Sequence, residues 1–216
     1  MGGTLSEADS TALLSEFGVP FAEQRVVPDA GEAARAAAAL GFPVVAKLCG
    51  DAIAHKTERG LVRLDLRDPA SVTAAATELL AAAKPEDGPV SILIASMVSG
   101  TRELIAGLSR DAQFGMTVMV GIGGVLAEAL GDVSIRLIPI ARVDAADMLD
   151  ELETQSLLLA FRGEPALDRD AMIEVLMALS ALAQARPDVA SVDLNPLVLV
   201  NGAPIAVDAL VELGPE

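Results

Sequence analysis

The amino-acid sequence predicts an α+β fold built from helices and antiparallel strands. Residues that cap helices precede alanine-rich stretches, and short apolar runs are bounded by glycine or proline. Near the C-terminus, the tight-turn pair Asn201-Gly202 joins two apolar runs. With 216 residues, the chain is long enough for one domain or for two closely packed lobes.

Helices in the first half of the chain are predicted from their capping residues. Ser6 can cap a helix that runs to about Phe17, and Asp29 can cap a second helix over residues 31–40. A third helix is expected over residues 68–84, with proline in its first turn. Apolar or alternating runs predict extended segments over residues 19–27, 42–49, 61–66 and 90–98.

The second half of the chain predicts a larger group of strands with two helices. The helices are expected over residues 143–152 and 169–186. Strands are expected over residues 103–109, 116–120, 134–140, 189–193, 197–200 and 205–210.

Turn-forming residues suggest where the chain divides into lobes. Proline and glycine gather near residues 18–20 and again over residues 84–100. We therefore expect residues 19–98 to form a smaller lobe, and residues 1–18 together with 99–216 to form a larger one.

Charge and hydropathy exclude several classes of protein. The chain has 31 acidic and 15 basic residues, a net charge of −16, and such an acidic surface repels nucleic acid and anionic membranes. The longest apolar stretch, residues 115–127, is shorter than the roughly 20 residues of a spanning helix. We expect a cytoplasmic protein in which Cys49, the single cysteine, is a core residue.

Basic residues cluster in one predicted loop and the strand before it. Only three lysines occur, and two of them, Lys47 and Lys56, lie within ten residues of each other beside the single histidine, His55. A lysine within a buried strand needs an anion, which can be a bound phosphate or a salt-bridge partner, unless its ammonium reaches solvent. His55 can be a base, a metal ligand or a phosphoryl acceptor, or a plain surface residue.

The C-terminal hairpin carries oxygen ligands at strand spacing. Asp193 and Asn195 are two residues apart and leave one face of a strand, and Asp208 on the returning strand falls opposite Asn195 or Leu194. Such groups suit Mg²⁺, although they can equally cap a surface hairpin. Gly121–Gly124 can cradle a phosphate or form a bend, and Glu103 can be a pocket acid or a strand-end charge. Together these residues can hold a nucleoside triphosphate between two lobes.

Several separated motifs resemble the ATP-grasp subunit of ADP-forming acyl-CoA (acetyl-CoA) synthetases and, more distantly, the β subunit of succinyl-CoA synthetase. The similarity runs from about residue 5 to residue 213, with the motifs in matching order. The motifs are VVAKLCGDAIAHKTERGLVRL (44–64), REL (102–104), FGMTVMVGIGG (114–124), AEALGDVSIRLIPI (127–140), FRG (161–163), VDLNPLV (192–198) and VDA (207–209).

The resemblance implies an ATP-grasp fold, with two α/β lobes enclosing a nucleotide site, and an acid–thiol ligase that interconverts acyl-CoA, ADP and phosphate with acid, CoA and ATP. It implies ATP or ADP and Mg²⁺ as cofactors. It also implies a CoA-binding α subunit, or fused CoA-binding domains, without which the chain is inactive. His55 would carry the phosphoryl group. The nucleotide would meet Lys47, Lys56, Glu103 and, at its adenine edge, backbone groups around Ser96, Met97 and Val98. The metal would meet Asn195 and Asp208, with Asp193 nearby.

Four positions depart from the pattern of that family. Leu61 replaces a glycine, Ala160 a glycine, Ser191 a glutamate and Leu210 an arginine. These departures favour one alternative, a regulatory or scaffolding ATP-grasp module that transfers no phosphate. A carboxylate–amine ligase, which needs no phosphohistidine, is a further alternative.

Overall fold

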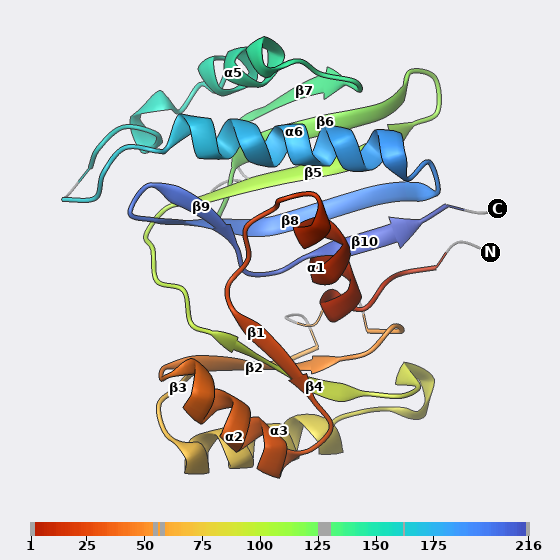
Figure 1. Cartoon of the computed structure of the whole chain (residues 1–216), viewed down its shortest axis with the longest axis vertical. Coiled ribbons are helices and arrows are strands. Elements are labelled where there is room, and N and C mark those ends of the chain that lie inside the picture. The colour runs from red at the N-terminus through yellow and green to blue at the C-terminus, as the bar shows by residue number, and fades with distance from the viewer. Residues whose placement is uncertain (1–2, 54–55, 57–58, 125–130, 162, 215–216) are drawn as a thin grey trace. The chain divides into compact units, whose positions relative to one another are not determined.

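The structure is a computed structural model that describes residues 3–53, 56, 59–124, 131–161 and 163–214. The chain forms two compact units (Figure 1). We call the first the small unit, Thr4–Asp9 with Ala22–Met97, and the second the large unit, Met1–Gly3 with Ser10–Phe21 and Val98–Glu216. Among the described residues, no helix is both long and apolar enough to cross a membrane.

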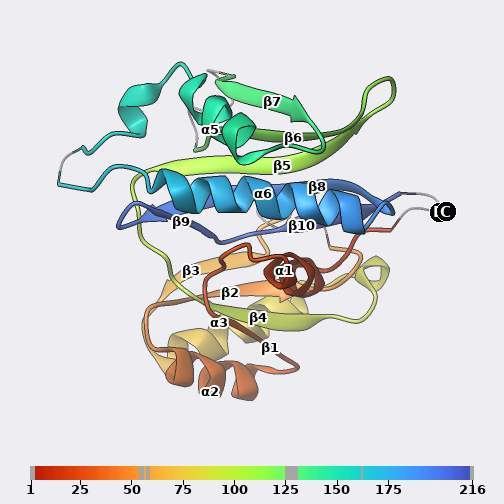
Figure 2. The same ribbon diagram turned by 45° about the horizontal axis from the view of Figure 1, so that its top comes forward.

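The small unit contains a four-stranded antiparallel sheet with two helices against one face. The strand order is β1-β4-β2-β3. Figure 2 shows α2 and α3 on the same side of this sheet. The elements are β1 (Gln24–Val27), α2 (Ala30–Leu40), β2 (Val44–Cys49), β3 (Val62–Leu66), α3 (Pro69–Ala81), the 3₁₀ turn η1 (Pro85–Asp87) and β4 (Ser91–Ser96).

Both helices of the small unit begin at the predicted caps. Asp29 accepts the backbone N–H of Glu32 at 2.8 Å, and Asp68 accepts that of Ser71 at 2.8 Å. Each bond satisfies a donor that the first helical turn leaves unpaired. Helix α3 ends at Ala81, earlier than predicted, and the 84–88 region forms the turn around η1 instead.

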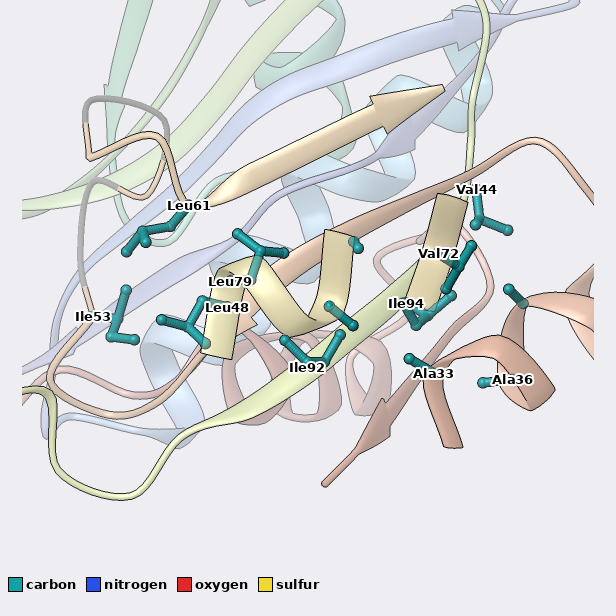
Figure 3. Close-up of a cluster of buried hydrophobic side chains, with 13 residues drawn as sticks. Ala33, Ala36, Val44, Leu48, Ile53, Leu61, Val72, Leu79, Ile92 and Ile94 are labelled. Atoms are coloured by element: carbon teal, nitrogen blue, oxygen red, sulfur yellow. The ribbon is translucent and has the colours of Figure 1, made fainter. Parts of the chain in front are cut away.

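Strand β2 is buried on both faces, as its apolar sequence predicts. Val44, Ala46 and Leu48 face α2 and α3, where they pack with side chains of β4 and both helices (Figure 3). Because side chains alternate along a strand, Lys47 and Cys49 lie on the opposite face. On that face Cys49 packs with residues of β4 and of the first turn of α1.

The large unit contains an antiparallel sheet of order β10-β8-β5-β6-β7, and β9 pairs with β8. Helices α5 and α6 contact the sheet and each other, and both lie on one side of it (Figure 2). Helix α1 is divided between the two units. The elements are α1 (Glu7–Glu16), β5 (Glu103–Asp111), β6 (Gly115–Ile122), β7 (Val133–Leu137), α5 (Arg142–Asp150), the 3₁₀ turn η2 (Gln155–Leu157), α6 (Arg169–Ala185), β8 (Val189–Val200), β9 (Ala203–Ala206) and β10 (Leu210–Leu213).

The C-terminal strands differ from the prediction in where they break. The two strands expected over 189–193 and 197–200 form one strand, β8, and the strand expected over 205–210 is divided between β9 and β10. Proline has no N–H for a ladder bond and is tolerated at irregularities. Pro196 lies where the register between β5 and β8 shifts, so the strand continues through it.

Candidate functional site

Two buried lysines of the small unit share one carboxylate. Lys47 Nζ donates to Glu7 Oε1 at 2.6 Å, and Lys56 Nζ donates to Glu7 Oε2. The exposed fractions of the three side chains are 8% for Lys47, 7% for Lys56 and 1% for Glu7. Removing ammonium groups from water is costly, and the shared carboxylate offsets part of that cost. The arrangement fixes two cationic side chains at one point, on the sheet face opposite α2 and α3.

Glu7 is a residue that the sequence analysis did not select. It lies in the first turn of α1, whose start is capped by Ser6: the backbone N–H of Asp9 donates to Ser6 Oγ at 3.2 Å. Lys47 therefore has a salt-bridge partner, one of the two kinds of anion that the sequence left open, and its contact with phosphate stays a prediction. An acidic residue just after a helix cap was the available signal, but nothing local connects it to a strand forty residues away.

His55, the predicted phosphoryl carrier, lies outside the described residues. The nearest described side chains on either side in sequence are those of Ile53 and Lys56, both buried. Three residues after Lys56, Arg59 pairs with Asp87 through two bonds of 2.7 and 2.8 Å. The segment that carries His55 is thus flanked by anchored residues.

The predicted adenine edge, Ser96 to Val98, lies at the end of β4 and beyond it. Ser96 donates its backbone N–H to Glu23 O at 2.8 Å, and Met97 donates its own to Pro43 O at 3.1 Å. All three residues are half-buried. The amides of Ser96 and Met97 are therefore engaged within the small unit, and contact of this edge with a base stays a prediction.

The polar residues of β8 lie on one face of the large sheet. Asp193 and Asn195 are exposed and alternate with the buried Val192 and Leu194. Because side chains alternate along a strand, Asp193 and Asn195 share one face of β8, and Val192 and Leu194 share the other.

Asp208 lies at the level of Asn195. Strand β9 pairs with β8 as far as Ala206, and β10 pairs with β8 from Leu210, which lies opposite Asp193. Asp208 lies between β9 and β10. When the register of either strand with β8 is continued to this residue, Asp208 lies opposite Asn195. The turn at residues 201–202 thus produces the juxtaposition that its sequence predicts.

The donor set of this hairpin contains two carboxylates and one amide. Asp193, Asn195 and Asp208 offer hard oxygen ligands, which Mg²⁺ accepts in small numbers because it keeps several waters. Within the described part of the chain, no group of three or more His, Cys, Asp and Glu side chains is arranged to hold a metal ion. A metal here would therefore depend on the amide of Asn195 and on ligands that accompany the ion, such as phosphate oxygens.

The glycine-rich turn lies against Glu103. The backbone N–H of Gly123 donates to Glu103 O at 2.7 Å, and that of Ile122 donates to Asp132 O at 3.1 Å. A Cβ built on Gly123 would lie 3.0 Å from backbone atoms of Glu103 and Leu104. These two amides therefore donate to the protein's own carbonyls. Because Gly123 has no side chain, its backbone can lie close to that of Glu103 and Leu104, as expected if the glycines form a bend.

The four departures from the family pattern have different surroundings. Leu61 is 2% exposed and belongs to the core of the small unit (Figure 3). Ser191 Oγ donates to Glu212 Oε2 at 2.7 Å, and Leu210 pairs with Asp193. Ala160 is exposed.

Cys49 is buried and free, as predicted for a core residue. Burial raises the pKa of its thiol, so the thiol stays protonated at neutral pH. The structure therefore gives no support to a nucleophilic role for this cysteine.

Comparison with known proteins identifies relatives over nearly the whole chain. Residues 2–213 match the model of the ATP-grasp domain. The β subunit of ADP-forming acetate–CoA ligase I from Pyrococcus furiosus is 32% identical over 208 residues, covering 95% of this chain and 90% of that subunit. ADP-forming acetate–CoA ligase I from Archaeoglobus fulgidus is 34% identical over 218 residues and 100% of this chain, which spans only 32% of that longer protein.

Solved structures agree with these matches. The dinucleotide-forming acetyl-coenzyme A synthetase 1 of Ca. Korarchaeum cryptofilum, in complex with coenzyme A and Ca-AMPCP, is 32% identical with a TM-score of 0.90, covering 98% of this chain and 94% of that one. A second structure of that protein holds coenzyme A and Mg-AMPPCP, with a phosphohistidine segment that points towards the nucleotide-binding site. It is 33% identical with a TM-score of 0.83, covering 98% and 93% of the two chains.

Proposed function

Because the chain belongs to the ATP-grasp domain family, and within it to the β subunits of ADP-forming acetate–CoA ligases, we propose that it is the nucleotide-binding, phosphoryl-transferring part of an ADP-forming acyl-CoA synthetase. The reaction converts acyl-CoA, ADP and phosphate into acid, CoA and ATP, and it is reversible. The observation that carries the proposal is the match over 90% of a β subunit by a chain that buries Lys47 and Lys56 at one point.

The paired lysines supply the positive charge that nucleotide phosphates require. On a chain of net charge −16, an anionic ligand needs a local cationic site. Lys47 and Lys56 are held in place by Glu7, so less conformational entropy is lost when they bind an anion. In this proposal Lys47 contacts the phosphates and Lys56 lies beside it.

The hairpin of the large unit would hold the magnesium that accompanies the nucleotide. Asn195 and Asp208 would be its ligands, with Asp193 nearby on the same strand. When bound, the ion would neutralise charge on the phosphate oxygens. The donor set fits this ion because all three side chains offer oxygen and none offers sulfur or nitrogen.

His55 is proposed to exchange the phosphoryl group. A ring nitrogen of His55 would bond to the γ-phosphorus of ATP while the bond to the bridging oxygen of ADP breaks, and the imidazole would lose its proton to solvent. The reverse step regenerates ATP. Neutral imidazole is the nucleophile, and it needs little activation for this step.

A CoA-binding partner would complete the enzyme. The Pyrococcus furiosus relative is a separate β subunit, whereas the chain covers about a third of the Archaeoglobus fulgidus relative. We propose that this chain works with a CoA-binding α subunit or with fused CoA-binding domains, and that it forms no acyl-CoA alone.

Reconstitution tests this proposal. The chain is mixed with the CoA-binding subunit of a relative, and ATP formation from acetyl-CoA, ADP and phosphate is followed. We expect activity only when both proteins are present, and none with His55→Ala, whose nucleotide affinity should be unchanged. Turnover by His55→Ala equal to that of wild type would contradict the role of His55 as phosphoryl carrier.

A further inference from the structure

Three exposed apolar side chains share one face of the outermost strand of the large unit. Strand β7 ends the sheet order β10-β8-β5-β6-β7, and Figure 1 shows it at the outer edge of the sheet. Val133, Ile135 and Leu137 are 43%, 52% and 52% exposed. They alternate with Ser134 and Arg136, so they lie on the same side of the strand. We call these three residues the β7 strip; contiguous exposed apolar side chains are typical of a surface that contacts another protein.

The other face of β7 is engaged within the large unit. Ser134 Oγ donates to Glu151 Oε2 at 2.8 Å, and Arg136 Nη2 donates to Glu151 Oε1 at the end of α5. Arg136 Nη1 also donates to Ile135 O at 3.0 Å, so this carbonyl already has a donor. A charged side chain at an edge strand hinders pairing with a further strand. A partner would therefore meet the apolar side chains of the strip rather than a ladder of backbone groups.

The opposite edge of the same sheet is covered by the chain itself. On β10, the backbone N–H of Val211 donates to Ser10 Oγ at 3.1 Å, and that of Leu213 donates to Gly3 O at 2.7 Å. For β7, in contrast, β6 is the only strand that pairs with it in the described part of the chain. The β7 edge is thus the one that these residues leave open.

The β7 strip lies on the same sheet face as Asp193. The ladders align Asp193 with Gly107, Gly107 with Met119, and Met119 with Ile135. Directly paired residues point to the same face, and neighbouring strands are about 4.8 Å apart, so three steps place the strip about 14 Å from Asp193. A protein seated on the strip would therefore lie near the hairpin that is proposed to hold Mg²⁺.

The strip is also a neutral part of an acidic chain. The β7 strip and its neighbours on β6, Thr117 and Met119, carry no charge, whereas the whole chain has a net charge of −16. CoA carries phosphate groups, and an acidic surface repels them. A protein that brings CoA would meet less repulsion at this strip than at an acidic surface.

We propose that the β7 strip is a contact surface for the CoA-binding partner. The inference rests on the proposed function, which requires such a partner close to the nucleotide. This chain spans 32% of the Archaeoglobus fulgidus relative, so most of that protein is additional chain. The contact would remove the exposed apolar area of Val133, Ile135 and Leu137 from water, which stabilises the complex.

Four variants separate a contact at the strip from a general effect of surface changes. Ile135→Lys and Leu137→Lys each place a charge in the contact, and Ile135→Leu keeps an apolar side chain there. Leu64→Lys is the matched control, because Leu64 is 64% exposed on β3, an edge strand of the small unit. None of these residues belongs to the proposed nucleotide or metal site, so ADP affinity should keep its wild-type value.

Three measurements are made on wild type and on each variant. They are the Kd for the CoA-binding partner by biolayer interferometry, the Kd for ADP by calorimetry, and sedimentation velocity of the chain alone. We expect Ile135→Lys and Leu137→Lys to weaken partner binding about tenfold or more, with the Kd for ADP within about twofold of wild type. Ile135→Leu and Leu64→Lys should match wild type, and all chains should sediment alike.

Two outcomes would overturn the role of the β7 strip. One is wild-type affinity for the partner in both lysine variants. The other is a wild-type chain that self-associates alone and loses this on Ile135→Lys, which would assign the strip to a second copy. Both leave the proposed function intact, because the wild-type chain still binds its CoA-binding partner. A wild-type chain that binds no such partner would instead contradict the proposed function, and the inference with it.

Discussion

Glu7 determines how the small unit tolerates two lysines in its interior. Lys47 and Lys56 come from a strand and a loop, and each finds the same carboxylate on α1. Truncating Glu7 would take the shared carboxylate from both ammonium groups, and truncating one lysine would take one of the two cations from the carboxylate, so either change alters a buried charge balance. A lysine at this site can therefore be tested only with a control that shows that the fold is kept.

Lys47→Met should lower the affinity for ADP and ATP by roughly 10- to 100-fold, the value of one charge-assisted hydrogen bond. Isothermal titration calorimetry measures this change, and circular dichroism checks the fold. Lys84→Met is the matched control, because Lys84 is exposed and should leave affinity unchanged. Equal affinities for Lys47→Met and wild type would make Lys47 a purely structural residue.

Asp208→Ala should weaken nucleotide binding only when magnesium is present. Losing one carboxylate ligand lowers metal affinity, so ADP titrations with Mg²⁺ should show the loss and titrations with EDTA should not. Asp170→Ala, at a carboxylate that is 91% exposed, is the control for the change in net charge. If Asp208→Ala binds Mg·ADP as tightly as wild type, Asp208 is not a metal ligand.

The Arg59–Asp87 pair predicts a pH dependence of stability. The hydrogen bond from Arg59, supported by the Lys84 amide, lowers the pKa of Asp87 to about 2. Because the folded-state pKa lies below the unfolded value of about 3.9, the stabilisation is fully present above pH 4 and disappears as the pH falls towards 2. The difference in urea midpoint between wild type and Asp87→Asn should be constant from pH 5 to 8 and shrink below pH 4; a difference that grows below pH 4 would contradict this.

At the scale of elements, one buried arginine organises a connection of the large unit. Arg102 is 6% exposed, and its guanidinium donates to the carbonyls of Leu157, Leu159 and Pro165 and to the carboxylate of Glu164. The segment between α5 and α6 has backbone carbonyls that are not paired in regular secondary structure, and Arg102 donates hydrogen bonds to three of them.

Arg102→Met should lower the free energy of unfolding by about 2–4 kcal/mol, because several acceptors and one carboxylate lose their donor. Urea unfolding measures the change. Arg186→Met is the comparison, since Arg186 pairs on the surface with Asp188 two residues away and should cost less than about 1 kcal/mol. Equal losses in the free energy of unfolding for the two substitutions would contradict a stabilising role of the Arg102 hydrogen bonds beyond that of a surface ion pair.

Elements whose causes are local could be predicted from sequence. A cap and its amide lie three residues apart, so the starts of α2 and α3 follow from Asp29 and Asp68. The break between β9 and β10 and the continuous β8 depend on pairing partners elsewhere in the sheet, so the predicted division of residues 189–200 into two strands was wrong. Glu7 was missed for the same reason, because its two lysines lie 40 and 49 residues away.

At the scale of the whole molecule, the chain combines a strong negative charge with a small buried basic site. A net charge of −16 disfavours anionic ligands everywhere except where cations are held together, as at Lys47 and Lys56. Under the proposed function, nucleotide phosphates would bind at this basic site, and the negative charge of the rest of the chain would repel nucleic acid. The juxtaposition of the hairpin side chains was likewise predictable, since Asp193 and Asn195 share a strand face and Asp208 follows a two-residue turn, and their role as metal ligands stays a prediction.

Phosphate on His55 is the central claim, and intact mass measures it most directly. The purified chain is incubated with Mg·ATP and its CoA-binding partner and kept alkaline, which preserves phosphohistidine. We expect one phosphate adduct that mild acid removes and that His55→Ala lacks. A wild-type chain that binds nucleotide in a parallel titration yet gains no adduct would contradict the claim and favour a non-catalytic ATP-grasp module.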